Sequence, residues 1–417
     1  MQTREVTVGS QIKLGIDESA HLSAAVRRIK TSAVNLASQR VRELKAQGRS
    51  IVDLTAGEPD FATPAHVCDA AIAAMHAGQT RYTAVGGTLE LRQAIARKFK
   101  RDNGLEYAAA EIFVGTGAKQ VLFNALAATV DAGDEVVILA PCWVAYPEMV
   151  KFTGGEPVLV AQGKDTYEMF LARVSKAITP RTKWLMINSP NNPSGAYFCR
   201  EQLRALADLL LDHPHVWAMV DDIYEQILFD GRTFATLAEV EPRLKQRTLT
   251  INGVSKAYSM TGWRIGYGGG PAELVRAMAK IQSQSTSAPC SISQAAAVAA
   301  LDGPQDLVRE RCAIFEARRN LLLKEFESIR GLRPNAPQGT FYLFLDCSRL
   351  IGMTTPQRET IASDEQLVND LLMRAGVALL HGTPFGAPGH LRLSFAASES
   401  NLIKACGRLR AATGEMQ

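Results

Sequence analysis

Short apolar runs alternate with longer amphipathic stretches through the middle of the chain. Between most of the runs lie helix-like segments such as EQLRALADLLLDH, residues 201–213. This alternation is typical of βαβ units and predicts a mainly parallel sheet with helices on both faces. The runs expected to form buried strands are 135–140, 183–188, 217–222, 249–253 and 265–270.

The two ends of the chain show a different pattern. Residues 31–48 have the spacing of one helix that ends at Gly48. The C-terminal third combines long helical stretches, at 307–329 and 364–376, with the short apolar runs 340–346 and 390–396. We expect a smaller α+β domain there. The 417 residues exceed the roughly 250–300 at which one hydrophobic core stops growing, so a second domain suits the length.

Composition narrows the functional classes. The net charge of +4 is dispersed over 417 residues without a run of five or six like charges, which argues against nucleic acid. No 18 apolar residues run together, and the first residues lack the pattern of a signal peptide. The seven cysteines are scattered without a CxxC pair, which argues against disulfides and a metal site. We expect a cytoplasmic protein that binds no nucleic acid, membrane or metal.

Polar residues that follow the apolar runs are candidates for a ligand site, because open α/β sheets bind ligands beyond the carboxyl ends of their strands. Residues 112–114 are followed by GTGAKQ, a glycine turn that opens a helix. Backbone N–H groups at such a start favour an anion, so Gly117 and Ala118 would admit a phosphate, although the turn also has a purely structural explanation. Asp221 and Asp222 end another run, where buried carboxylates need a cationic or hydrogen-bonding partner.

The stretch SKAYSMTGWRIGY, residues 255–267, places Lys256 and Arg264 eight positions apart. The arginine fork matches a phosphate bidentately, and a lysine can form a Schiff base with an aldehyde. A carboxylate at a buried strand end would suit a cationic ring nitrogen. Pyridoxal 5′-phosphate carries the phosphate, the pyridinium and the aldehyde, so it is the expected cofactor.

Five motifs resemble those of the class I/II aminotransferases, the fold-type I pyridoxal-phosphate enzymes, and especially their bacterial aspartate aminotransferase branch. They occur in the family's order from about Ser32 onward. The resemblance implies a mainly parallel seven-stranded sheet flanked by helices in a large cofactor domain, residues 63–304, and a small domain formed by 1–62 and 305–417. The motifs are GEPDF (57–61), SPNNPSG (189–195), DDIYE (221–225), SKAYSMTGWRIGY and LRLSFA (391–396).

The same resemblance assigns roles around the cofactor ring. Lys256 would hold the cofactor and, once freed, move the proton between substrate and cofactor. Asp221 would keep the pyridinium nitrogen protonated, with Asp222 in a supporting role. Tyr224 would hydrogen-bond the ring oxygen together with Asn192. Trp143 would stack on the ring, the alternative being an ordinary core tryptophan.

The phosphate end of the cofactor is expected at the glycine turn. Many relatives carry a phosphate-binding serine where this chain has Gly253, and Ser255 is its expected replacement. Tyr82 resembles the tyrosine that reaches the phosphate of the neighbouring subunit, which implies a homodimer with shared active sites. The residues expected at the phosphate of the same subunit are Gly117, Ala118, Lys119, Ser255 and Arg264.

Substrate recognition is expected to depend on Arg392. In LRLSFA this arginine matches the residue that clamps the α-carboxylate through two parallel hydrogen bonds, a geometry that lysine cannot reproduce. Gly57 matches a substrate-facing backbone position near it. Trp143 and Asn192 complete the expected substrate site. The sequence identifies no cation for a second, distal carboxylate.

These residues imply an aminotransferase that moves an amino group from an L-α-amino acid, aspartate-like or aromatic, to a 2-oxo acid such as 2-oxoglutarate. One alternative keeps the fold and cofactor but catalyses elimination, or a specialised cyclisation or decarboxylation in secondary metabolism, since the same lysine, aspartate and arginine serve these reactions. The other is a non-enzymatic binding or regulatory protein.

Overall fold

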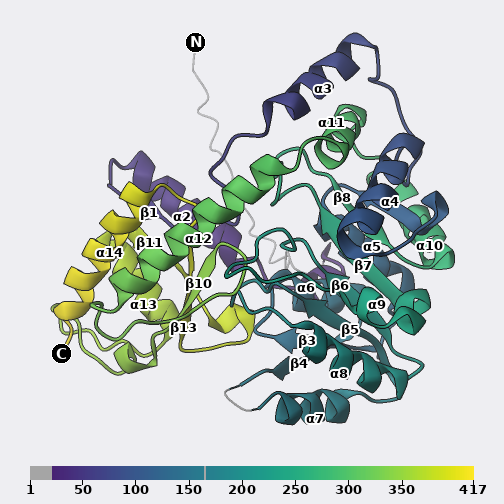
Figure 1. The fold of residues 1–417 in the computed structure, drawn as a ribbon. Helices are drawn as coiled ribbons and strands as arrows, with labels where there is room; N and C mark the ends of the chain where they lie inside the picture. Colours follow the sequence, from purple (N-terminus) through teal and green to yellow (C-terminus); the bar gives the residue numbers. More distant parts are fainter. Residues whose placement is uncertain (1–20, 164–165) are drawn as a thin grey trace, which may run out of the picture.

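A seven-stranded sheet forms the centre of the structure, a computed structural model that describes residues 21–163 and 166–417 (Figure 1). The strands lie in the order β2-β8-β7-β6-β5-β3-β4, and only β8 runs antiparallel to its neighbours. The predicted mainly parallel, seven-stranded sheet is therefore confirmed. The strands are β2 (Ile112–Gly115), β3 (Glu135–Ala140), β4 (Glu156–Ala161), β5 (Thr182–Asn188), β6 (Trp217–Asp221), β7 (Thr248–Gly253) and β8 (Gly266–Gly269).

Helices cover both faces of this sheet because successive strand residues point to opposite sides. Met186 of β5 packs in one core with α5 (Ala118–Thr129) and α10 (Ala272–Ser283). Its neighbour Leu185 packs in another core with α7 (Tyr167–Ala177) and α8 (Arg200–Leu211). The other helices of this part of the chain are α3 (Ala65–His76), α4 (Leu89–Asn103), α6 (Ala145–Thr153), α9 (Leu237–Val240) and α11 (Ser291–Asp302).

Strand β8 lies directly against the start of α5. A Cβ atom added at Gly266 would lie 2.0 Å from the backbone nitrogen of Ala118, so no side chain fits between the two elements. This close approach brings the first turn of α5 to the edge of the sheet where β5, β6 and β7 end. The loop between β7 and β8 carries Lys256 and Arg264 to the same edge.

Smaller sheets join the two ends of the chain. Strand β1 (Val52–Asp53) pairs with β11 (Val377–Ala378), and β12-β13-β10-β9 form an antiparallel sheet. The predicted α+β region is thus present, although residues 371–375 of the expected helix 364–376 form a π-helix. The remaining α-helices and strands are α1 (Ala24–Arg28), α2 (Ala33–Ala46), α12 (Asp306–Phe326), α13 (Asp364–Asp370), α14 (Glu399–Gly414), β9 (Arg333–Asn335), β10 (Tyr342–Asp346), β12 (Leu380–His381) and β13 (His390–Ser394).

The domain limits 63–304 and 1–62 with 305–417 stay a prediction. The strands of the large sheet lie within residues 112–269, and those of the smaller sheets lie within 52–53 and 333–394. Residues 1–20 of the predicted small domain, where no signal peptide is expected, lie outside the described residues.

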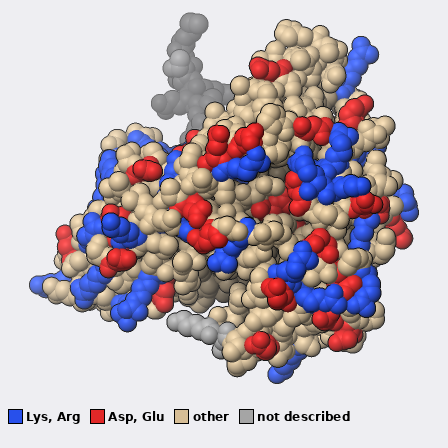
Figure 2. Space-filling view, in the orientation of Figure 1, with Lys and Arg blue, Asp and Glu red and all other residues tan. Residues whose placement is uncertain are grey.

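Positive and negative side chains are interspersed over the face shown in Figure 2. No helix in the described part of the chain has the length and apolar character needed to cross a bilayer. Within residues 21–163 and 166–417, no group of three or more histidine, cysteine, aspartate and glutamate side chains is placed to hold a metal ion.

Candidate active site

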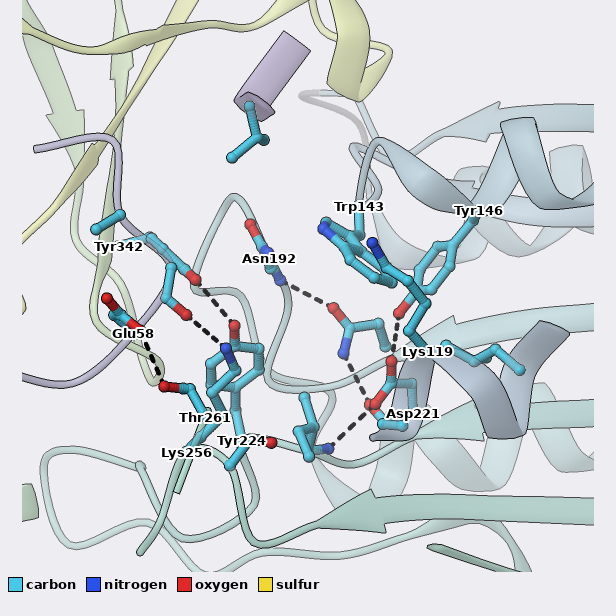
Figure 3. A pocket seen from close by; sticks show the side chains of 18 of the residues that line it. Glu58, Lys119, Trp143, Tyr146, Asn192, Asp221, Tyr224, Lys256, Thr261 and Tyr342 are labelled. Carbon is cyan, nitrogen blue, oxygen red and sulfur yellow. Dashed lines mark hydrogen bonds between the residues drawn. The ribbon is translucent and has the colours of Figure 1, made fainter. Parts of the chain in front are cut away.

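A cavity of about 400 Å³ lies where β5, β6 and β7 end and α5 begins (Figure 3). It brings together most of the side chains that the sequence singled out, from segments up to 335 residues apart, Gly57 to Arg392. The predicted residues that line it are Gly57, Ala118, Lys119, Trp143, Asn192, Asp221, Tyr224, Ser255, Lys256, Arg264 and Arg392.

Two predicted residues, Gly117 and Tyr82, do not line this cavity. Gly117 lies behind Arg264, with a φ of +84°, and a Cβ atom there would lie 2.3 Å from the Nη2 atom of that arginine. Only glycine allows the chain to turn here and the guanidinium to pack onto it. Tyr82 is 96% exposed.

The amine of Lys256 lies inside the cavity, where its Nζ atom donates a hydrogen bond to the carbonyl oxygen of Gly57. Burial lowers the pKa of this amine to about 8, and the positive charges of Arg392 and Arg264 act in the same direction. An amine with this pKa is partly uncharged near neutral pH, as a nucleophile toward an aldehyde must be.

Asp221 ends β6 with its carboxylate buried at the cavity wall. Its Oδ2 atom accepts a hydrogen bond of 2.7 Å from the hydroxyl of Tyr146, and its Oδ1 atom accepts one of 3.3 Å from the backbone N–H of Ile223. Burial raises the pKa of Asp221 to about 6, while Tyr146, Ile223 and Lys256 oppose the rise. The site therefore holds a carboxylate that a cationic ligand would stabilise.

Asp222 does not line the cavity, and its supporting role stays a prediction. Its Oδ2 atom accepts a hydrogen bond of 2.6 Å from Thr236. Gly253, at the position of the missing serine, is crowded: an added Cβ atom would lie 3.0 Å from the side chain of Ile223 and 3.1 Å from the carbonyl oxygen of Ile265. Ser255 lines the cavity instead.

Among the cavity residues that were not predicted from the sequence, Asn188, Tyr146 and Tyr342 form hydrogen bonds to predicted ones. The Nδ2 atom of Asn188 donates to the carbonyl oxygen of Asp221 at 2.7 Å, and its Oδ1 atom accepts from the N–H of Asn192 at 2.9 Å. Because Asn188 is the last residue of β5, the strand-end rule would have found it. No sequence pattern pointed to Tyr146 or Tyr342, because their hydrogen-bond partners, Asp221 and Tyr224, lie 75 and 118 residues away in sequence.

Arg392 is a buried guanidinium with unused hydrogen-bonding capacity. It is 1% exposed, donates to Asn192 Oδ1 at 3.0 Å and to the carbonyl oxygen of Thr55 at 2.6 Å, and lies 4.4 Å from the ring centre of Tyr342. Its Nε atom has no hydrogen-bond partner, and neither acceptor of its two hydrogen bonds within the described residues is a carboxylate. Burial lowers its pKa, so an anionic ligand would be strongly favoured here.

The residues present fit pyridoxal 5′-phosphate. Trp143 offers an indole beside the buried carboxylate of Asp221, and Lys256 offers the amine. Gly117 and Arg264 form a close-packed corner at the first turn of α5, where a phosphate is favoured. Together, the fold and the site define a pyridoxal-phosphate-dependent enzyme of fold type I.

Known proteins agree with this class. A family model described as aminotransferase class I and II matches residues 49–409. The aspartate/prephenate aminotransferase of Cereibacter sphaeroides is 49% identical over 393 residues, which cover 94% of this chain and 98% of that protein. The chain belongs to the aminotransferase class I and II family.

Solved structures show the same fold. The crystal structure of the aspartate aminotransferase from Rhizobium meliloti superposes with a TM-score of 0.91 at 48% identity, covering 95% of this chain and 99% of that one. The Thermus thermophilus aspartate aminotransferase with maleate gives a TM-score of 0.86 at 43% identity, covering 94% and 99%.

The chain is therefore an aminotransferase. It uses pyridoxal phosphate to move an amino group between an amino acid and a 2-oxo acid. The alternative activities, elimination, cyclisation or decarboxylation, are not favoured, and neither is a non-enzymatic role.

Proposed function

We propose that this aminotransferase uses aspartate, or a similar dicarboxylic amino acid, as the amino donor and 2-oxoglutarate as the acceptor. The observation that carries the proposal is a cation in the cavity beyond those that the cofactor and the α-carboxylate need. Four lysine and arginine side chains line it: Lys119, Lys256, Arg264 and Arg392. The names of the similar proteins support an aspartate donor, and maleate in the Thermus structure is itself a dicarboxylate.

Lys119 is the cation proposed to bind the distal carboxylate. Its Nζ atom lies 4.7 Å from the ring centre of Trp143, on the first turn of α5. Partial burial and Arg264 lower its pKa, so a bound carboxylate would stabilise the charged form. The sequence had predicted a cofactor role for Lys119. The donor-selectivity experiment below distinguishes the two roles.

The other residues keep the roles that the sequence suggested, now as proposals supported by the geometry. When bound, pyridoxal phosphate supplies the electron sink for the substrate carbanion. Lys256 would hold the cofactor and carry the proton. Asp221, oriented by Tyr146, would face the ring nitrogen. The ring oxygen would be bound by Tyr224 and Asn192.

The remaining residues of the site are proposed to bind the ring, the phosphate or the substrate. Trp143 would stack on the ring of the cofactor. Arg392 would bind the α-carboxylate with its free N–H groups, beside the backbone of Gly57, with Asn192 and Trp143 close by. The proposed phosphate ligands are Gly117, Ala118, Ser255 and Arg264.

Replacing Lys119 by methionine is expected to change donor selectivity. A charged hydrogen bond contributes about 1.5–3 kcal/mol, so kcat/KM for aspartate should fall roughly tenfold to hundredfold. Values for alanine and phenylalanine should stay within about threefold, because these donors lack the second carboxylate. The measurement is a panel of amino donors against 2-oxoglutarate, pyruvate, oxaloacetate and prephenate.

The control for this panel is Lys280→Met, an exposed lysine on the neighbouring helix α10. An equal loss for every donor, together with weaker binding of pyridoxal phosphate, would show that Lys119 serves the cofactor instead. Wild-type enzyme without activity on any dicarboxylic donor would refute the proposed substrate class.

Reassembly of the holoenzyme from apoenzyme and pyridoxal phosphate is expected to accelerate as the pH rises. The amine of Lys256 must be uncharged to attack an aldehyde, and its pKa is about 8. The rate constant should therefore increase about tenfold per pH unit between pH 6 and 7 and level off above about pH 9. Stopped-flow absorbance measures it, with N-acetyl-lysine as the reference amine. A rate constant that is still rising steeply between pH 9 and 10, as for an unshifted lysine, would contradict the lowered pKa.

We further propose a homodimer in the cytoplasm. Tyr82 is 96% exposed and does not line the cavity of its own chain, so it is accessible to another subunit. All seven cysteines are free, which suits a reducing compartment. Light scattering should give twice the 45.2 kDa mass of one chain. A monomeric mass for active enzyme would exclude the shared active site.

A further inference from the structure

Lys98 occupies a position where a lysine is not expected. Helix α4 buries an apolar stripe that runs from Leu91 to Phe99, and Lys98 falls on this stripe with 2% of its surface exposed. A buried ammonium group needs partners. The Nζ atom of Lys98 forms an ion pair with the carboxylate of Glu225 and donates a hydrogen bond of 2.7 Å to Asn103 Oδ1.

Glu225 completes the arrangement from the other side. It is 6% exposed, and its Oε2 atom accepts a hydrogen bond of 2.7 Å from the Nδ2 atom of Asn103. Its backbone N–H donates to the carbonyl oxygen of Asp222 at 2.9 Å, which closes the turn that follows β6. The carboxylate of Glu225 therefore ties this turn to α4 through two different side chains.

The turn tied in this way, Asp221–Glu225, carries three residues of the cavity, Asp221, Ile223 and Tyr224. Neither Lys98 nor Glu225 lines the cavity, so both hold the turn from outside it. Asp222 belongs to the same turn. Burial and the neighbouring carboxyl groups of Glu225 and Asp221 raise the pKa of Asp222, and the positive charge of Lys98 lowers it. Lys98 thus supplies a positive charge to a region that contains several carboxyl groups.

A buried ion pair of this kind is a poor source of stability. Removing two charges from water costs about as much as their attraction returns, and apolar replacements of both partners are often neutral. Such an ion pair does, however, restrict the geometry of the site, because a charge-assisted contact fixes the position of both partners. The contacts therefore point to a role in placing the turn.

We propose that Lys98 and Glu225 are positioning residues for transamination, whose ion pair holds the turn Asp221–Glu225 so that the Asp221 carboxylate and the Tyr224 hydroxyl face the cofactor ring. The inference rests on the roles proposed above for Asp221 and Tyr224. Lys98 and Glu225 act only through these two residues and touch neither cofactor nor substrate.

The test is the neutral double variant Lys98→Met/Glu225→Gln, which removes both charges of the pair together and keeps a partner for Asn103. Asp102, 3.9 Å from Lys98, keeps its ion pair with Arg101. Three quantities are measured: the melting temperature of the apoenzyme, the Kd for pyridoxal phosphate from the fluorescence of the apoenzyme, and kcat with KM for the donor. The matched control is Lys100→Met/Glu106→Gln, which removes an exposed ion pair of 2.8 Å that begins on the same helix.

The double variant should keep its melting temperature, while the Kd for pyridoxal phosphate rises and kcat falls, each at least tenfold. The KM for the donor should stay within about threefold, because Arg392 is untouched, and the control should behave as wild type. The single variant Lys98→Arg keeps the positive charge, so its Kd for pyridoxal phosphate should stay within threefold of wild type.

A double variant with wild-type Kd and kcat would overturn the inference, whether or not its melting temperature changes. Asp221→Asn in the otherwise unchanged chain separates this failure from that of the proposed function. If Asp221→Asn lowers kcat and the double variant does not, only the positioning role is wrong. If Asp221→Asn also has wild-type Kd and kcat, the role proposed for Asp221 is wrong.

Discussion

Lys256→Ala is expected to lower kcat by about 10⁴-fold or more. This side chain is proposed both to hold the cofactor and to move the proton, and proton transfer by a positioned side chain alone contributes about 10²–10⁴-fold. Its amine suits both tasks, because it lies in the cavity beside the carbonyl oxygen of Gly57 with a pKa lowered to about 8. Steady-state kinetics with aspartate and 2-oxoglutarate measure the loss.

A chemical measurement accompanies the kinetics. Borohydride reduction of wild-type holoenzyme should leave a stable adduct on the peptide that contains residue 256, and the variant should show none. Lys183→Ala is the control, an exposed lysine on β5 that pairs with Asp134 at 3.8 Å. If Lys256→Ala kept more than a tenth of kcat, or if the adduct formed at another lysine, the assignment of Lys256 would be wrong.

Arg392→Lys is expected to lower kcat/KM by roughly 10²–10³-fold for every amino donor. Lysine keeps the positive charge but cannot form two parallel hydrogen bonds to a carboxylate. Losing these charged hydrogen bonds costs about 3–4 kcal/mol, which corresponds to this factor. Since all donors carry the α-carboxylate, aspartate, alanine and phenylalanine should be affected alike, in contrast to Lys119→Met.

The control for this variant is Arg410→Lys on α14, whose guanidinium pairs with Glu325 at 2.7 Å. Circular dichroism and the absorbance of the bound cofactor verify that fold and cofactor are retained. A loss restricted to dicarboxylic donors would place Arg392 at the distal carboxylate instead, and unchanged kinetics would remove it from the substrate site.

Several features of the structure follow from patterns between residues that are near one another in sequence. The strand predicted at 135–140 has these limits in β3, and the strand predicted at 249–253 begins one residue earlier, at Thr248. The helix expected to end at Gly48 ends at Ala46, followed by Gly48 with a φ of +82°. Apolar alternation and glycine turns are local, so a single sequence contains enough information to predict them.

Other features depend on segments that meet only in the folded chain. The orientation of Asp221 requires Tyr146 and Asn188, and the burial of Arg392 requires Tyr342, all from distant parts of the sequence. Local pattern also gave no sign that β8 runs antiparallel or that residues 371–375 form a π-helix.

The sequence by itself indicated which residues would meet in one cavity, because strand ends and glycine turns place lysine, aspartate and arginine at one edge of a parallel sheet. The tertiary structure alone decided how these groups are held and charged. A pKa of about 8 for Lys256 and the ion pair between Lys98 and Glu225 both arise from burial among segments far apart in sequence. Burial is a property of the packed chain, and local spacing does not contain it.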